Sequence, residues 1–394
     1  MLDVIVVGGG PSGSHIARRL AEKGHKVQVL EAKSQPGEKS SCTGIVGWEC
    51  IKAYDIPDKV IYRQANSAMV FTPSNTTLHL YRKEPQACIL DRKAFDVFMA
   101  ERAQKAGAKY EFNCHVNGVV IEKDHADVLV THGNREEKVP ARAVVIASGF
   151  NPGLNEKVGL GSFKDYVTGV QAEVDAPYLE EVEVYFGDNA PGFFAWLVPT
   201  TPGKAKAGLL MRQEAGPHLK RMLEILYKLD EIKSKDVELH YGGIPLRPPP
   251  RTYGERLIAV GDAAGHTKPT SGGGIYYGLI GADIGAEVLH KALAEGDLTV
   301  GRLAQYEKAW RRKLGKEIRT GYWARRLYER LNNEQVDVIF KIIKSSGIDE
   351  ALLQAEDISF DWHSRTIMKL FKYQVVAGAL KAIRLPFKRG HIDR

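Results

Sequence analysis

The chain has 394 residues, of which 44% are hydrophobic, and a formal net charge of +7. It is too long for one ordinary hydrophobic core, so two or three structural units are expected. No apolar run reaches about 18 residues, so no transmembrane helix is predicted. The four cysteines lack the spacing of a metal site, and no metal is expected. A strand beginning at Leu2 leaves no room for a signal peptide, which favours a cytoplasmic protein.

The first 31 residues have the order of a dinucleotide-binding unit: strand, glycine turn, helix, strand and acid. Gly8 permits the tight turn, Gly10 lets the backbone approach a pyrophosphate, and Gly13 lets the helix pack closely on the strand. The helix N-terminus offers free amides and a positive dipole end to the phosphates. Glu31 ends the second strand, where an acid accepts the hydroxyls of an adenosine ribose. The expected cofactor-binding residues of this unit are Gly8, Gly10, Pro11, Ser12, Gly13, Glu31 and Ala32.

NAD and FAD share this fingerprint, and a second glycine-rich segment distinguishes them. A short apolar strand ends in Gly261-Asp262, and Gly273-Gly274-Ile275 then opens a long helix rich in small residues. This segment resembles the second FAD signature of glutathione-reductase-type flavoproteins, especially the p-hydroxybenzoate hydroxylase subgroup. The resemblance implies that Asp262 holds a ribityl hydroxyl and that the helix N-terminus faces the pyrimidine edge of the flavin. A helix N-terminus there stabilises the negative charge of reduced flavin, so FAD is the predicted cofactor.

The pattern along the chain predicts an α/β fold with a discontinuous Rossmann FAD domain of the glutathione-reductase type. An apolar strand ending at Gly149 is expected to finish beside the FAD. Long alternating segments predict an antiparallel β-sheet substrate domain, and a charged helical region follows at the C-terminus. The expected boundaries are 1–65, 90–162 and 243–300 for the FAD domain, 66–89 and 163–242 for the substrate domain, and 301–394 for the helical region.

Three further segments resemble the geranylgeranyl reductase family. In the motif Y-x-W-x-F-P of that family, Trp196 and Pro199 are kept, whereas Phe194 and Val198 replace the Tyr and the Phe. Residues 31–44 look like the family's stretch from the ribose acid to a cysteine-containing loop near the flavin, which holds Cys42 here. A third likeness is the Arg-x-x-Phe-Asp helix start at Arg92, another expected cofactor-binding residue.

The resemblance implies an FAD-dependent reductase of carbon–carbon double bonds in polyprenyl chains of lipids or isoprenoid precursors. Reduced flavin would pass a hydride from N5 to one alkene carbon, and a proton would reach the other. The developing cation needs an apolar, electron-rich pocket, which Phe193, Phe194 and Trp196 are expected to line together with Pro199. Cys42 and Trp196 are the candidate catalytic residues. The expected electron donor is NADPH or a ferredoxin-like protein.

Two other classes of function fit the same fold. A flavin-dependent aromatic monooxygenase or halogenase is the first, although such hydroxylases usually carry Asp-Gly where this chain has Ser148-Gly149. A non-catalytic lipid-binding protein that retains FAD is the second. The tail from Ser364 mixes apolar residues with six or more bases, which suits either contact with an anionic membrane at the inner face of the cell or packing on the enzyme itself. No motif indicates a nucleic-acid partner.

Overall fold

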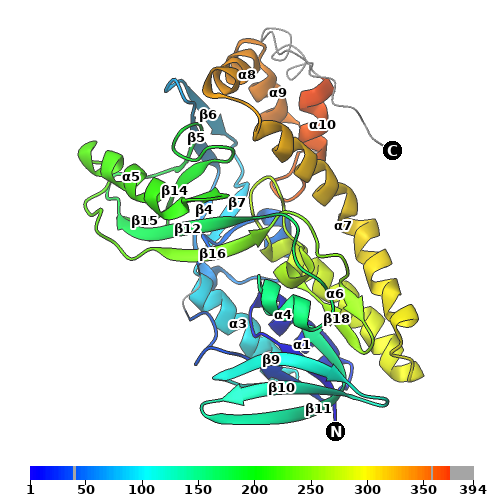
Figure 1. Ribbon diagram of the computed structural model, residues 1–394. Helices are drawn as coiled ribbons and strands as arrows, with labels where there is room; N and C mark the ends of the chain where they lie inside the picture. Colours follow the sequence, from blue (N-terminus) through cyan, green and yellow to red (C-terminus); the bar gives the residue numbers. More distant parts are fainter. Residues whose placement is uncertain (39–40, 356–357, 373–394) are drawn as a thin grey trace.

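The computed structural model describes residues 1–38, 41–355 and 358–372. A parallel sheet with its helices lies at one end of the molecule, and a second sheet lies in the middle (Figure 1). The C-terminal helices run along one side and over the far end (Figure 1). This arrangement confirms the predicted α/β flavoprotein fold with a helical C-terminal region.

The first sheet is parallel over its central strands, as the N-terminal motif predicted. Its spatial order is β17 (Tyr253–Gly254), β18 (Leu257–Ala259), β11 (Arg135–Ile146), β1 (Leu2–Val7), β2 (Val27–Leu30) and β8 (Lys109–Glu111). Successive side chains of β1 point to opposite faces, so Val4 and Val6 enter one core whereas Ile5 and Val7 enter another.

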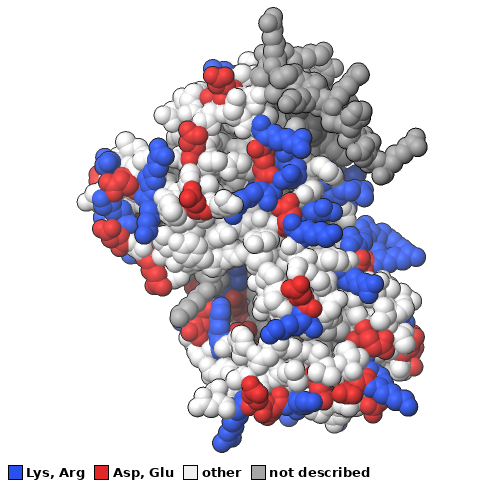
Figure 2. Space-filling view, viewed as in Figure 1, with Lys and Arg blue, Asp and Glu red and all other residues white. Residues whose placement is uncertain are grey.

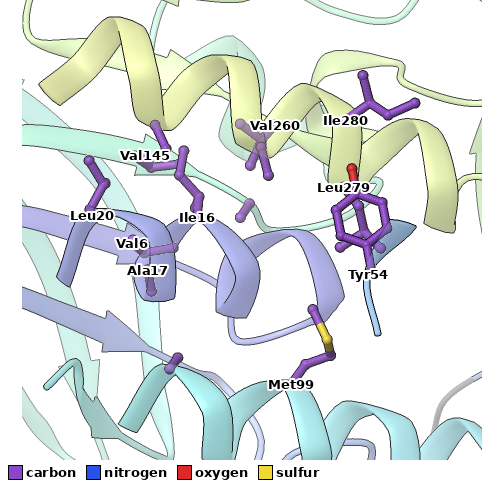
Figure 3. Close-up of a cluster of buried hydrophobic side chains, with 14 of the residues drawn as sticks. Val6, Ile16, Ala17, Leu20, Tyr54, Met99, Val145, Val260, Leu279 and Ile280 are labelled. Carbon is purple, nitrogen blue, oxygen red and sulfur yellow. The ribbon is translucent and has the colours of Figure 1, made fainter. Parts of the chain in front are cut away.

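Three helices cover the Val4 and Val6 face: α1 (Pro11–Glu22), α3 (Arg92–Lys105) and α6 (Ile275–Glu295). Figure 3 shows Ile16 and Leu20 of α1 in this core, close to Val145 and Val260. A meander of β9 (Cys114–Ile121), β10 (Ala126–His132) and the first half of β11 covers the other face. The strand predicted over 143–149 is therefore longer than expected, because its charged first half pairs with β10 at the surface.

The second sheet has seven strands. Their order is β16 (His240–Pro245), β12 (Tyr166–Asp175), β15 (Lys204–Met211), β14 (Ala195–Pro199), β13 (Val182–Tyr185), β5 (Ser67–Phe71) and β6 (Thr77–Tyr81). One face packs on α5 (Ala215–Lys228), a helix that the strand-like reading of 163–242 missed. Strand β16 joins this sheet by pairing with β12, so the sheet continues past the expected boundary at 242/243.

Shorter elements connect the two sheets. They are β3 (Ile45–Gly47), β4 (Ile61–Ala65), β7 (Ala87–Leu90), α2 (Trp48–Ala53) and α4 (Pro152–Lys157). The C-terminal helices are α7 (Val300–Tyr328), α8 (Asn333–Ser345), α9 (Ile348–Gln354) and α10 (Ser364–Lys372). Helix α9 packs on β6, and α10 packs on α7. Within the described residues, no helix is long and apolar enough to cross a membrane.

Candidate active site

One large cavity, of about 1030 Å³, runs between the two sheets and the C-terminal helices. Both glycine segments, the cysteine-containing loop and the inner face of the seven-stranded sheet line it, as do residues of α8, α9 and α10. This volume is at the upper end of the roughly 300–1,000 Å³ typical of small-molecule pockets. The cavity therefore has room for a dinucleotide and for part of a second ligand.

Two helices begin at the wall of this cavity. Gly10 precedes α1 and Gly274 precedes α6, and neither N-terminus has a side-chain cap. The first amides of each helix lack an intrahelical acceptor, so both ends favour negative charge. Gly13 packs so closely that a Cβ there would overlap the carbonyl oxygen of Gly8. The predicted pyrophosphate end and the predicted pyrimidine end thus face one space.

Two carboxylates stand near these helix ends. Glu31 lines the cavity, and its Oε2 accepts the Gly9 amide at 2.6 Å while Oε1 accepts the Lys33 amide at 2.9 Å. These two bonds fix the carboxylate and leave lone pairs for hydroxyl donors. Asp262 also lines the cavity, and burial raises its pKa to about 6 although nearby Arg92 acts in the opposite direction.

Polar atoms without a protein partner test whether this end suits FAD. The Ser148 hydroxyl and Arg92 Nε are buried and lack a hydrogen-bond partner among the described residues, and both residues line the cavity. A Cβ at Gly10 or at Gly149 would meet no atom within 4 Å, so the backbone faces open space at both positions. A polar ligand that contains phosphates would supply the missing acceptors for these buried donors and would fit against the exposed backbone. The residues present fit FAD.

Cys42 lies half-buried in the cavity wall, on a loop held from two sides. Lys206 Nζ donates to the Cys42 carbonyl at 3.2 Å, and the Thr43 hydroxyl donates to Gln171 at 3.0 Å. The Arg92 guanidinium interacts electrostatically with the Cys42 side chain, and its Nη2 donates to Asp96 at 2.9 Å. Burial alone would lower the pKa of Arg92, but Asp96 and Cys42 outweigh it and raise that pKa.

Only part of the aromatic motif faces the cavity. Phe194 and Trp196 line it, and their ring centres are 6.1 Å apart with an angle of 63° between the ring planes. The Trp196 ring lies on Gly208, where a Cβ would collide with it. Phe193 does not line the cavity, because it is buried beneath the Arg325 guanidinium, whose carbon is 3.8 Å from its ring centre. Pro199, at the end of β14, is also buried outside the lining.

An apolar wing of the cavity extends away from the glycine segments and was not foreseen from the sequence. Its walls are aliphatic side chains of β5, β6, β13, α8 and α9: Val70, Leu78, Leu80, Val182, Val184, Ile343, Leu352 and Leu353. Thr366 and Leu370 of α10 belong to the same lining, so this part of the basic tail packs on the enzyme. The tail residues beyond 372 lie outside the described part of the chain.

A buried ion pair joins the flavin loop to the C-terminal segment, and sequence reasoning missed it. Lys268 Nζ lies 3.4 Å from Asp361, and both side chains are almost fully buried. Asp361 also accepts the amides of Gly47 at 3.2 Å and Cys50 at 3.3 Å. The available signal was a lysine in the flavin loop six residues after Asp262, because a lysine that becomes buried needs a partner.

The comparisons with known proteins agree with this geometry. The family model for pyridine nucleotide-disulphide oxidoreductases matches residues 2–176. A Thermoplasma acidophilum structure described as geranylgeranyl bacteriochlorophyll reductase-like superposes with a TM-score of 0.84 at 24% identity, covering 97% of this chain and 99% of that one. A flavin-dependent brominase superposes with a TM-score of 0.66 at 16% identity, covering 95% of this chain and all (100%) of that one. Both likenesses establish the fold.

The fold and the cavity define an FAD-dependent oxidoreductase. Digeranylgeranylglycerophospholipid reductase 1 of Methanothermobacter thermautotrophicus is 31% identical over 334 residues, which cover 80% of this chain and 84% of that protein. The Methanosarcina mazei enzyme of the same name is 29% identical, over 87% and 88% of the two chains. The chain belongs to this geranylgeranyl reductase family, as its motifs predicted, and its cofactor is FAD.

Proposed function

We propose that this protein reduces carbon–carbon double bonds in the prenyl chains of an isoprenoid lipid. The observation that carries the proposal is the apolar wing, which is continuous with the FAD end of the cavity and lined mainly by aliphatic side chains. A long hydrocarbon chain suits such a wing, because its burial removes apolar surface from water and requires no polar partner. The names of the sequence relatives point to the same class of substrate.

The residues at the FAD end bind and orient the cofactor. The amides of α1 would hold the pyrophosphate, and Glu31 would accept the ribose hydroxyls. The amide end of α6, beside Asp262, would favour the negative charge of the reduced isoalloxazine. When bound, FAD would supply the two electrons of the reduction as a hydride.

Trp196 and Phe194 stabilise the carbon centre. An isolated alkene has no carbonyl to take up charge, so positive charge develops on the alkene carbon that does not receive the proton, and this carbon then takes the hydride. The faces of aromatic rings attract cations, by about 2 kcal/mol or more where water is excluded. The apolar wing excludes water, which also prevents addition of a hydroxyl to that carbon.

Cys42 is the proposed proton donor. Its thiol can give a proton to the second alkene carbon, and the Arg92 guanidinium then stabilises the thiolate that remains. The saturated product gains one hydride and one proton, and the oxidised cofactor must be reduced again. NADPH or a ferredoxin-like protein is the proposed source of these electrons.

Anaerobic turnover tests the proposal. Dithionite-reduced enzyme is incubated with a geranylgeranyl glycerophospholipid, and mass spectrometry is expected to show two added hydrogens for each reduced bond. Trp196→Ala and Cys42→Ala should lower turnover while retaining the flavin absorbance. Cys88→Ala, at a buried cysteine outside the cavity lining, is the matched control. Turnover that needs oxygen and yields a hydroxylated or halogenated aromatic compound would contradict the proposal.

A further inference from the structure

Helix α7 is strongly basic, and its two acidic side chains bind to other segments of the protein. It contains nine Lys and Arg residues but two Glu residues. Glu307 accepts hydrogen bonds from Thr252, and Glu317 accepts the amides of His363 and Ser364. Both carboxylates therefore hold α7 to the enzyme, and most of the positive charge is left for the outer surface.

Four exposed cations of α7 and one exposed tryptophan lie on a single face. They are spaced by four, four, three and four residues, which is the spacing of one helix face. We call this set the basic stripe: Lys308, Arg312, Lys316, Arg319 and Trp323. The buried residues of the helix, including Leu303, Tyr306, Trp310 and Leu314, lie on the opposite side.

Most of the other cations of α7 pair with a carboxylate, and Lys313 lies instead over the ring of Trp362. Arg311 pairs with Glu307, whereas Arg325 and Arg326 pair with Glu329. Within the described residues, none of the four stripe cations lies within ion-pair distance of a carboxylate. Trp323 is 64% exposed at the end of the stripe. Figure 2 shows Lys and Arg gathered along the right-hand side of the molecule at middle height, where α7 runs in Figure 1.

The helix that carries the stripe contacts a wall of the cavity. Helix α10 packs on α7, and Thr366 and Leu370 of α10 line the apolar wing. Met368 of α10 is 54% exposed, and Arg365 is exposed as well. Exposed basic and apolar side chains therefore occur on two packed helices, one of which lines the compartment proposed for the prenyl chain.

We propose that the basic stripe, with Met368 and Arg365, docks this enzyme on an anionic lipid surface. The proposal rests on the proposed function, because a membrane is where a prenylated lipid is found. From Lys308 to Trp323 the stripe extends about 22 Å in a straight line, at roughly 1.5 Å per helical residue. Such a line of cations matches a planar, uniformly charged surface. An exposed tryptophan is typical of the boundary between headgroups and acyl chains.

Vesicle flotation tests this surface with the full-length, FAD-loaded protein. The vesicles contain phosphatidylcholine with one part in three phosphatidylglycerol, or phosphatidylcholine alone, at low salt. The double variant R312E/R319E should bind anionic vesicles at least roughly tenfold more weakly, because two attractive charges become repulsive. The control K220E/R221E makes the same change in net charge at exposed positions of α5, and it should bind like the wild type.

Trp323→Ala separates the apolar contribution from the electrostatic one. Added salt screens the attraction of the cations, so wild-type binding should fall as salt rises, and Trp323→Ala should bind more weakly at every salt concentration. Equal losses in the two double variants would contradict a localised surface. So would wild-type protein that ignores anionic vesicles while it binds an acidic protein or DNA through α7.

A soluble substrate keeps the two proposals distinguishable. R312E/R319E should reduce a detergent-dispersed prenyl substrate at the wild-type rate, because the stripe does not line the cavity. Normal turnover without any vesicle binding by the wild type would overturn the docking surface and leave the proposed function intact. Absent turnover in the wild type would remove the proposed function whatever the vesicles show.

Discussion

The two ends of the cavity are built by different means. The FAD end consists of main chain brought close to the ligand by glycines, and each of its two helix N-termini comes from one continuous segment. The apolar wing consists of side chains from β5, β6, β13, α8 and α9, which are far apart in the sequence. The difference teaches that a polar cofactor demands particular backbone geometry, whereas a hydrocarbon chain demands only shape and the absence of water.

The largest expected effect tests the backbone geometry of the FAD end. Gly13→Ala should yield a colourless protein, because the new Cβ would overlap the Gly8 carbonyl and force α1 away from β1. Absorbance near the flavin bands and FAD release on denaturation measure it. Gly118→Ala is the control, since its Cβ would meet only a Leu129 methyl at 3.8 Å. Normal FAD content in Gly13→Ala would show that this close approach is not required.

The next effect tests whether the two ends form one cooperative unit. Asp361→Ala leaves Lys268 as a buried, unpaired charge, and removing one partner of a buried pair costs about 3–5 kcal/mol. Urea unfolding, followed by flavin and tryptophan fluorescence together, measures the free energy of unfolding. Asp175→Ala breaks a half-exposed pair with Lys204 and should cost about 0–1 kcal/mol. Similar losses in the two variants would mean that the C-terminal segment is not coupled to the flavin loop.

The third prediction concerns how the free energy of unfolding depends on pH through a buried histidine at the FAD end. Burial lowers the pKa of His266, in the flavin loop, to about 3, far below the ordinary value of about 6.5 for histidine. Above about pH 6.5 the His266 ring is neutral in both the folded and the unfolded protein. As the pH falls from about 6.5 toward 3, His266 is protonated in the unfolded protein but stays neutral in the folded protein. The free energy of unfolding therefore decreases. His266→Leu should remove part of this decrease, on the order of 3 kcal/mol between pH 6.5 and 4.

Calorimetry between pH 6.5 and 4 measures the free energy of unfolding of the wild type and of His266→Leu. The exposed His79 supplies the control, and His79→Leu should keep the wild-type slope. An unchanged slope in His266→Leu would show that this ring does not contribute to acid sensitivity.

The smallest effect is expected in the apolar wing. Val184→Ala removes two methyl groups from the wall, which corresponds to about 1–2 kcal/mol of lost contact and roughly a tenfold lower kcat/KM for a prenyl lipid. FAD content should not change. Val120→Ala, at an exposed position of β9, should leave both unchanged. Loss of FAD in Val184→Ala would show that the apolar wing also contributes to FAD binding, contrary to the comparison between the two ends of the cavity.

Sequence patterns predicted the parts of the fold that depend on local rules. The strands and helix around Gly8 to Glu31 and the helix after Gly274 lie where they were expected. Which motif residues face the cavity was harder to predict. Phe193 and Phe194 are neighbours in sequence and their rings are stacked, yet Phe193 lies under Arg325 whereas Phe194 lines the cavity. Arg325 belongs to α7, so the burial of Phe193 depends on a helix far away in the sequence.

The apolar wing could not be predicted because its residues carry no distinctive chemistry. Leu352 and Leu353 would fit equally well in an ordinary helix core, and their role depends on α9 packing against β6. The same holds for the basic stripe. Lys316 and Arg319 belong to a helix that is charged along its length, and the positions of Glu307 and Glu317 in the fold decide which cations stay unpaired.

The Asp361 contacts also determine when, during translation, this part of the fold can form. The Gly47 amide bonds to a carboxylate that lies 314 residues later in the chain. At about 5–20 residues per second, translation needs on the order of tens of seconds to deliver it. During that interval the glycine motifs have left the ribosome, but Lys268, once made, still lacks its counter-charge. The flavin compartment can therefore be completed only after residue 361 has been synthesised.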